Sequence, residues 1–214
     1  MLLNVLPRSI AERLKGSPDV IADNFPEVTV LFADIVGFTR FSAGVSPAEL
    51  VVLLNAIFTD FDNIDDDRGL EKIKPIGDAY MAAAGVPVLA TDHAVRAAHM
   101  ALDMIDALAL FNKHSNSRFQ MLIGINSGTV VAGVIGKRKF TYDLWGDTVN
   151  TASGMESHGV AGCILMTEAA GRRQSGSLLC AERGIIDVKG VGAMPTWFLI
   201  GRTGAPTLLN ILIL

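Results

Sequence analysis

The stretch VTVLFADIVGFT, Val28 to Thr39, decides how the rest of the chain is interpreted. Its first five residues are largely apolar and partly β-branched, which predicts a buried strand. We expect this strand to end at Asp34 and to lead into a turn at Gly37, followed by a helix. A carboxylate at the end of a buried strand is costly to desolvate without a partner. Asp34 is therefore interpreted either as a metal or phosphate site or as a helix N-cap, and this stretch alone favours neither.

Composition bounds the class of protein. The chain has 214 residues, half of them hydrophobic, which allows one large domain with a sizeable core and excludes wholesale disorder. A net charge of −4 gives no overall electrostatic reason to expect binding to nucleic acid or to an anionic membrane. Cys163 and Cys180 lack CxxC spacing, which predicts buried thiols, no structural zinc and a reducing, cytoplasmic location.

The two ends of the chain differ from its middle. Residues 2–15 have apolar positions at mixed helical spacings and predict a short amphipathic helix, which Gly16-Ser17-Pro18 ends. This helix either lies on its own domain or belongs to a dimerising, signal-carrying segment of a longer protein. We expect three parts: a helical segment over 1–20 with a linker to 26, a domain over 27–202, and an apolar tail over 203–214. No run reaches the roughly 18 apolar residues of a membrane helix, so the chain is expected to be soluble.

Two helices are predicted in the first half. Ser46-Pro47-Ala48-Glu49 combines an N-cap, a proline at the first helical position and an acidic third position. The acidic run Asp65 to Asp67 closes this helix, and we expect it to be solvated and without a chemical role. Thr91 to Leu110 is Ala-rich and predicts a second helix. His93 and His99 on it are interpreted as surface or capping residues rather than metal ligands.

Between these helices, GLEKIKPIGDAYMAAAGVP predicts a β-hairpin that turns at Ile76-Gly77-Asp78. If this hairpin lies beside the opening strand, Asp34 and Asp78 come within roughly 5 to 10 Å of each other. Two convergent carboxylates favour Mg²⁺ or Mn²⁺ held together with substrate phosphates. Pro75 removes a strand N–H and predicts an edge position or a bulge.

The second half predicts more strands. Phe119 to Asn126 and Thr129 to Ile135 are expected to pair around Ser127-Gly128. After a basic turn at 136–139, a short strand, Gly146 and a helix N-terminus carrying Asn150 make phosphate binding plausible. Residues 163–200 predict short strands and one helix over 168–173, with Lys189 at the end of the penultimate strand. This order favours an α/β (α+β) sandwich of ferredoxin-like type over a doubly wound sheet.

Three motifs, LFADIVGFT, EKIKPIGDAYM and YDLWGDTVNTAS, occur in this order, and together the chain resembles the class III nucleotidyl cyclase catalytic domains over about residues 27–200. The resemblance implies a ferredoxin-like domain that works as a homodimer, with active sites at the subunit interface. It implies that Asp34 and Asp78 bind two Mg²⁺ or Mn²⁺ ions. The backbone of Ile35, Val36, Gly37, Phe38 and Thr39 would lie along the triphosphate.

The resemblance also implies roles in substrate choice. Lys74 and Asp143 match the purine-selecting pair, and a lysine donor with an aspartate acceptor suits adenine. ATP is therefore expected over GTP, because guanylate cyclases typically carry Glu and a small residue at these positions. Asn150 matches the asparagine that orients the ribose. Arg138 and Lys189 match phosphate-binding cations. The expected function is an adenylate cyclase acting in signal transduction, with a preceding helix like that of membrane-bound and receptor cyclases, and thus the cytosolic part of a larger membrane protein.

One position departs from the family pattern. Four residues after Asn150, where the family places an arginine that stabilises phosphate charge in the transition state, this chain has Gly154. The sequence offers no packing reason for this glycine. The chain is therefore interpreted either as an adenylate cyclase, with activity reduced by this glycine, or as a nucleotide-binding regulatory partner. A guanylate cyclase is the third alternative.

Overall fold

A computed structural model describes residues 6–16, 20–136, 139–174 and 176–204. The helices are α1 (Arg8–Gly16), α2 (Phe38–Ser42), α3 (Pro47–Arg68), α4 (His93–Ser115), α5 (Asp147–Ser157) and α6 (Glu168–Gly171). The strands are β1 (Ala22–Ile35), β2 (Glu71–Ile76), β3 (Ala79–Ala84), β4 (Met121–Ile135), β5 (Thr141–Trp145), β6 (Cys163–Thr167), β7 (Leu178–Val188) and β8 (Gly192–Arg202).

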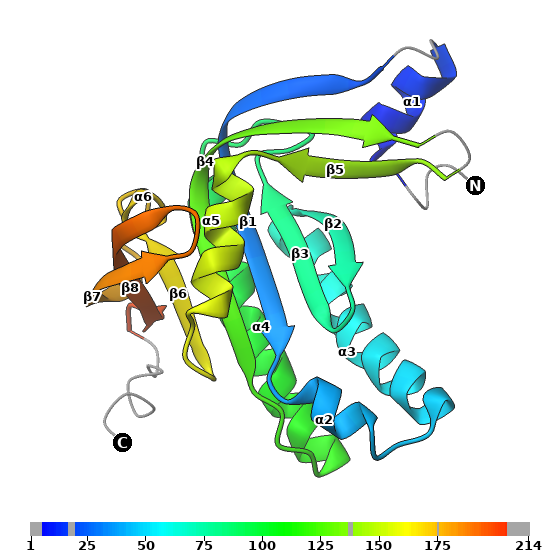
Figure 1. Ribbon diagram of the computed structural model, residues 1–214, viewed down its shortest axis with the longest axis vertical. Helices are drawn as coiled ribbons and strands as arrows, with labels where there is room; N and C mark the ends of the chain where they lie inside the picture. The colour runs from blue at the N-terminus through cyan, green and yellow to red at the C-terminus, as the bar shows by residue number, and fades with distance from the viewer. Residues whose placement is uncertain (1–5, 17–19, 137–138, 175, 205–214) are drawn as a thin grey trace.

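These strands form one sheet in the order β2-β3-β1-β4-β6-β8-β7, and β5 pairs with β4 outside this path. Only the pairing of β4 with β6 is parallel among the described strand pairs. The mixed α+β class with an antiparallel-containing sheet is thus confirmed. Beyond the central sheet, the first half of β1 and the hairpin of β4 and β5 extend as an arm toward α1 (Figure 1).

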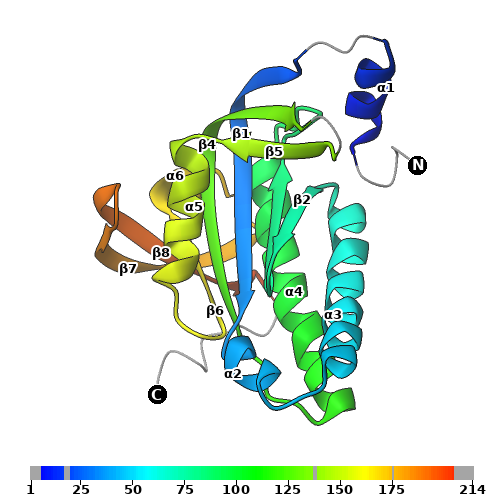
Figure 2. The same cartoon turned by 45° about the vertical axis from the view of Figure 1, so that its right-hand side comes forward.

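Strand β1 lies between two apolar cores because its side chains alternate between the two faces of the sheet. Leu31, Ala33 and Ile35 pack into the core beneath α3 and α4, whereas Val30 and Phe32 pack into the core on the other face. Figure 2 shows α3 and α4 on one side of β1 and α5 on the opposite side. The predicted buried strand is confirmed, and it begins earlier than expected, at Ala22.

Helix α3 begins as predicted. The Ser46 side chain accepts from the Glu49 N–H, and the Glu49 side chain accepts from the Ser46 N–H, which completes a capping box. Gly69 ends the helix in the left-handed conformation at φ 67°. The acidic run at this end is not uniformly solvated, however, because Asp65 is only 5% exposed. The expectation that Asp65 is a solvated surface residue was therefore wrong.

Strand β4 corrects a second prediction. The expected strand pair around Ser127-Gly128 is one continuous strand, and its residues pair with β1 from Met121 to Gly133. Gly128 serves a close approach rather than a turn, since a Cβ there would lie 2.6 Å from Thr148 Oγ1 on α5. The Ser127 hydroxyl lies 2.6 Å from Thr29 Oγ1, so it links β4 to β1 within the sheet.

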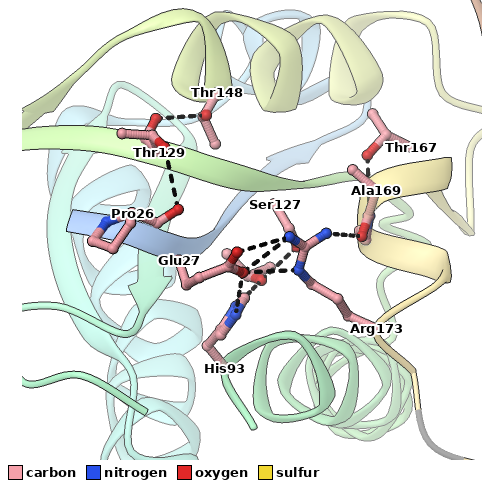
Figure 3. A network of polar contacts seen from close by, with 11 residues as sticks. Pro26, Glu27, His93, Ser127, Thr129, Thr148, Thr167, Ala169 and Arg173 are labelled. Carbon is pink, nitrogen blue, oxygen red and sulfur yellow. Dashed lines mark hydrogen bonds and ion pairs between the residues drawn. The ribbon is translucent and has the colours of Figure 1, made fainter. Parts of the chain in front are cut away.

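His93 also differs from its predicted surface position, because it is 3% exposed at the first turn of α4. Its Nδ1 lies 2.7 Å from Thr29 Oγ1, and its Nε2 lies 3.4 Å from a Glu27 carboxylate oxygen. Figure 3 shows Glu27 between His93 and Arg173, which donates to both Glu27 oxygens. This network joins β1 to α4 and to the turn after α6, so it organises the fold. Desolvation by burial lowers the pKa of His93.

Helix α1 packs onto the arm. Ile10 and Ala11 are buried in the same core as Tyr142 and Leu144 of β5, and Arg13 pairs with Asp23 at the start of β1. None of the helices in the described part of the chain is long and apolar enough to cross a membrane. Both cysteines are free thiols, but Cys180 is exposed, which corrects the prediction that both are buried.

Candidate functional site

Asp34 and Asp78 are brought together by the pairing of β1 with β3. Asp34 pairs with Ala79, the residue that follows Asp78 in the hairpin turn. Burial and the nearby Asp78 carboxylate raise the pKa of Asp34 above its ordinary value. A divalent cation between them would relieve this repulsion, so this pair fits a metal site bounded by two carboxylates.

A third carboxylate, Glu156, faces this pair from α5. Burial, and then the negative charges of Asp34 and Asp78, raise the pKa of Glu156. The close contact of α5 with β4 places it there, since a Cβ on Gly124 would overlap the Glu156 backbone nitrogen. Sequence reasoning missed Glu156. No group of three His, Cys, Asp or Glu residues in the described ranges has the geometry of a metal cage.

The segment after Asp34 turns sharply into α2. Gly37 adopts φ 74°, a left-handed conformation that favours glycine, and caps α2 without a side-chain hydrogen bond. Val36 N–H donates to the Gln120 carbonyl, which holds the turn against the start of β4. Phe38 is 5% exposed and anchors the helix in the core. The segment 35–39 is therefore a fixed turn directly beside the two carboxylates.

Lys74 and Asp143 form an ion pair. Lys74 Nζ lies 2.5 Å from Asp143 Oδ2, although 69 residues separate them in the sequence. Asp143 is 7% exposed, and its other oxygen accepts from the Leu144 N–H. A lysine donor and an aspartate acceptor are thus held side by side between β2 and β5.

Asn150 and Lys189 line one cavity of about 320 Å³, together with Asp147, Gly190 and Val191. The N-terminus of α5 supplies the asparagine and the turn between β7 and β8 supplies the lysine. Asp147 was not singled out from the sequence, although its position one turn before Asn150 on a helix would have indicated it. The cavity offers an amide, an ammonium group and a carboxylate to a polar ligand.

Gly154 packs against the end of β7. A Cβ at this position would lie 2.5 Å from Cγ1 of Val188, which is 2% exposed. Close packing therefore accounts for this glycine, which corrects the statement that it has no packing reason. Arg138 lies outside the described residues.

The fold is thus an α+β domain that carries a pair of carboxylates and a polar cavity. The chain belongs to the family described as "Adenylate and Guanylate cyclase catalytic domain", whose model matches residues 20–201. An "Adenylate cyclase" of Mycobacterium tuberculosis is 46% identical over 203 residues, which cover 94% of this chain and 46% of that protein. "Atrial natriuretic peptide receptor 2" of Homo sapiens is 42% identical over 98% of this chain and 20% of its own length.

Solved structures agree with this membership. The guanylate cyclase domain of RhGC from Catenaria anguillulae in complex with GTP matches with a TM-score of 0.82 and 36% identity, over 85% of this chain and all of that one. The adenylyl cyclase CyaB from P. aeruginosa matches with a TM-score of 0.81 and 27% identity, over 86% of this chain and 99% of that one. The chain spans about half the length, or less, of the curated relatives that it matches.

Proposed function

We propose that this chain is an adenylate cyclase domain that converts ATP to 3′,5′-cyclic AMP and pyrophosphate. The ion pair of Lys74 with Asp143 carries the choice of ATP, because an ammonium donor suits a ring nitrogen of adenine and a carboxylate acceptor suits its exocyclic amine. Guanine reverses this pattern at its six-position, where it presents an oxygen acceptor. The 46% identity to a mycobacterial adenylate cyclase supports the same choice.

The reaction is an in-line displacement at the α-phosphorus. The ribose 3′-oxygen forms the new bond to phosphorus, the bond to the β-phosphate oxygen breaks, and pyrophosphate leaves while the 3′-proton passes to solvent. Asp34 and Asp78 would hold Mg²⁺ or Mn²⁺, which when bound lower the pKa of the attacking hydroxyl and neutralise the phosphates. The turn at 35–39 would lie along the triphosphate.

The remaining residues position the nucleotide. Asn150 would orient the ribose, and Lys189, on the same cavity, would bind the triphosphate. Arg138 is proposed as a further phosphate contact. Within the described ranges, no hydrogen bond or ion pair joins the Asp34 carboxylate to this cavity or to the Lys74 ion pair. This separation fits a homodimer. Each active site would then combine the metal carboxylates of one subunit with the nucleotide-positioning residues of the other.

Gly154 favours a second candidate function. A chain without the transition-state arginine binds nucleotide but turns it over slowly, as a regulatory partner would. This alternative predicts metal-dependent ATP binding by calorimetry without turnover, and efficient turnover by the purified chain would exclude it.

The test is product formation by the purified chain with Mn²⁺ and either ATP or GTP, at several protein concentrations. We expect cyclic AMP from ATP, with specific activity that rises with protein concentration because the active form is a dimer. Cyclic GMP from GTP at comparable efficiency would contradict the proposed substrate. Absence of product together with ATP binding would select the regulatory alternative.

We also propose that the chain acts as the cytosolic part of a longer membrane protein, with α1 setting the dimer geometry. The apolar side of α1 and its contact with the arm motivate this proposal. If removal of residues 1–20 leaves both dimerisation and activity unchanged, the proposal is wrong.

A further inference from the structure

A β-bulge in β2 directs two lysines to opposite faces of the sheet. Lys72 pairs with Ala82 and Lys74 pairs with Met81, so the register shifts by one residue between them. Ala82 belongs to the core beneath α3 and α4, whereas Met81 belongs to the core on the other face. In a regular strand, residues two apart lie on one face, and Lys74 would then share the face of Lys72. The bulge is what turns Lys74 toward Asp143.

Side chains from the end of α3 hold β2 immediately before this bulge. Oδ2 of the buried Asp65 accepts from the Lys72 backbone N–H at 3.1 Å. Both carboxylate oxygens of Asp62 bind Lys72 Nζ, at 2.7 and 2.8 Å. The Tyr80 hydroxyl donates to Asp62 at 2.8 Å from the neighbouring strand β3. Lys72 is therefore fixed through both its backbone and its side chain.

We propose that Asp65 and Asp62 are positioning residues for Lys74: by holding Lys72 they maintain the bulge, and thereby set which purine the domain accepts. This inference rests on the proposed function, because Lys74 is there the base-recognising lysine. Asp65 itself contacts no substrate. Burial of Asp65 lowers the stability of the fold, because its second oxygen, Oδ1, is buried without a hydrogen-bond partner among the described residues. The hydrogen bond to the Lys72 backbone is the contact that Asp65 provides at this position.

The experiment compares Asp65→Leu with Asp65→Asn. Leucine has the same branched arrangement of side-chain heavy atoms, although it is larger, and it cannot accept from Lys72. Asparagine keeps a carbonyl oxygen that can. We expect Asp65→Leu to raise KM for ATP and to lower the ratio of kcat/KM for ATP over GTP by about tenfold, the effect of one misplaced hydrogen bond to the base. Asp65→Asn should keep the wild-type ratio. Asp67→Leu, at an exposed position on the same helix end, is the matched control.

The ATP-to-GTP ratio separates positioning from a merely structural role, since a loss of folded protein lowers both rates equally. A folded Asp65→Leu that keeps the wild-type ratio within about twofold would overturn the inference. If Asp65→Leu does not fold, Asp62→Ala replaces it, because alanine cannot accept from Lys72 and the Asp62 side chain is partly exposed, so its loss leaves no buried cavity. An unchanged ratio in Asp62→Ala would then overturn the inference equally.

A measurement of nucleotide binding separates the test of this inference from the test of the proposed function. Dissociation constants of fluorescent ATP and GTP analogues are measured with Ca²⁺, without turnover. If the wild-type chain makes no cyclic nucleotide, the proposed activity fails, but a preference for ATP that Asp65→Leu loses would still support the positioning role. If the wild type cyclises ATP and the Asp65→Leu and Asp62→Ala variants keep its preference in both assays, only the positioning role fails.

Discussion

Individual side chains in this domain carry functions that their neighbours in sequence do not share. Asp65 is buried and bound to the Lys72 backbone, whereas Asp66 and Asp67 beside it are exposed. Lys72 pairs with Asp62, whereas Lys74, two residues later, pairs with Asp143. Each residue is therefore understood from its partner rather than from its residue type.

Asp34→Asn should lower cyclase activity by at least about a hundredfold, because it removes a carboxylate from the pair that would hold the metal ions. The amide keeps the volume, so the free energy of unfolding should not fall. Steady-state rates with Mn²⁺ measure the loss of activity, and urea denaturation measures the free energy of unfolding. Asp60→Asn on the exposed side of α3 is the control, and an Asp34→Asn variant with wild-type activity would contradict the metal assignment.

Gly154→Ala should destabilise the domain by about 1 to 3 kcal/mol, because its Cβ would overlap the buried Val188. The sign of the change in the free energy of unfolding is diagnostic, because a glycine-to-alanine change at a helix position with free space normally stabilises the protein. In a Val188→Ala background, the same change at Gly154 should cost much less, because the overlapping methyl group is gone. Urea denaturation of the single and double variants measures it, and a Gly154→Ala variant more stable than wild type would show that Val188 moves aside easily.

Gly154→Arg combined with Val188→Ala should raise kcat by about tenfold or more, provided that an arginine here reaches the phosphates. Gly154→Arg alone should gain less, because Val188 opposes its side chain. The comparison of kcat among these two variants and Gly154→Ala/Val188→Ala isolates the guanidinium. Equal rates in the two double variants would mean that this position has no catalytic role in this chain.

The junction of α3 with β2 affects the stability of the domain and, in our proposal, its choice of purine. Burial, and next the Glu71 charge, raise the pKa of Asp65 from 3.8 to about 7, and burial with Asp66 raises that of Glu71 to about 7. Two raised carboxyl pKa values at one junction mean that the folded state binds protons there more tightly than the unfolded chain. The element thus costs stability at neutral and alkaline pH.

Asp65→Asn should be more stable than the wild type at pH 8, by on the order of 2 kcal/mol, and nearly equal to it at pH 4. The wild-type free energy of unfolding should fall as pH rises from about 4 to about 7, where only the folded state keeps the proton, and should level off above. The asparagine side chain cannot ionise, so the profile of the variant should be flatter. Chemical denaturation at each pH tests this, and parallel profiles would refute it.

The whole molecule presents its candidate residues in separate groups: the carboxylate pair at the end of β1, the cavity beside α5, and the ion pair between β2 and β5. Figure 1 shows the arm of β4 and β5 reaching away from the central sheet. In the proposed homodimer, the carboxylates of one subunit would meet the proposed nucleotide-positioning residues of the other.

Mixing two inactive variants tests this arrangement. Asp34→Asn and Asn150→Ala should each lose activity alone. Their mixture should recover up to about a quarter of the wild-type activity, since half of the dimers are mixed and each contains one intact site of two. If Asp34 and Asn150 served a site within one subunit, the mixture would stay inactive.

The sequence alone determined the local elements and the family. The capping box at Ser46 and the hairpin turn at Gly77 are local signals, and helix α3 and the hairpin of β2 and β3 formed where they indicated. The resemblance rested on three ordered motifs and led to the family that the comparisons show. The roles assigned to Asp34, Asp78, Lys74, Asp143, Asn150 and Lys189 stay predictions.

Only the tertiary structure decided which polar side chains are buried and what they contact. Ser127-Gly128 resembles a turn locally, but the strand continues because both residues pair with β1, and the glycine is there because α5 leaves no room for a Cβ. Asp65 and His93 read as surface residues, but β2 and β1 supply partners from 7 and 64 positions away. Such contacts depend on how elements distant in sequence pack, and residue spacing does not predict them. The elements follow from local sequence, whereas the bulge, the buried carboxylate and the site follow from packing.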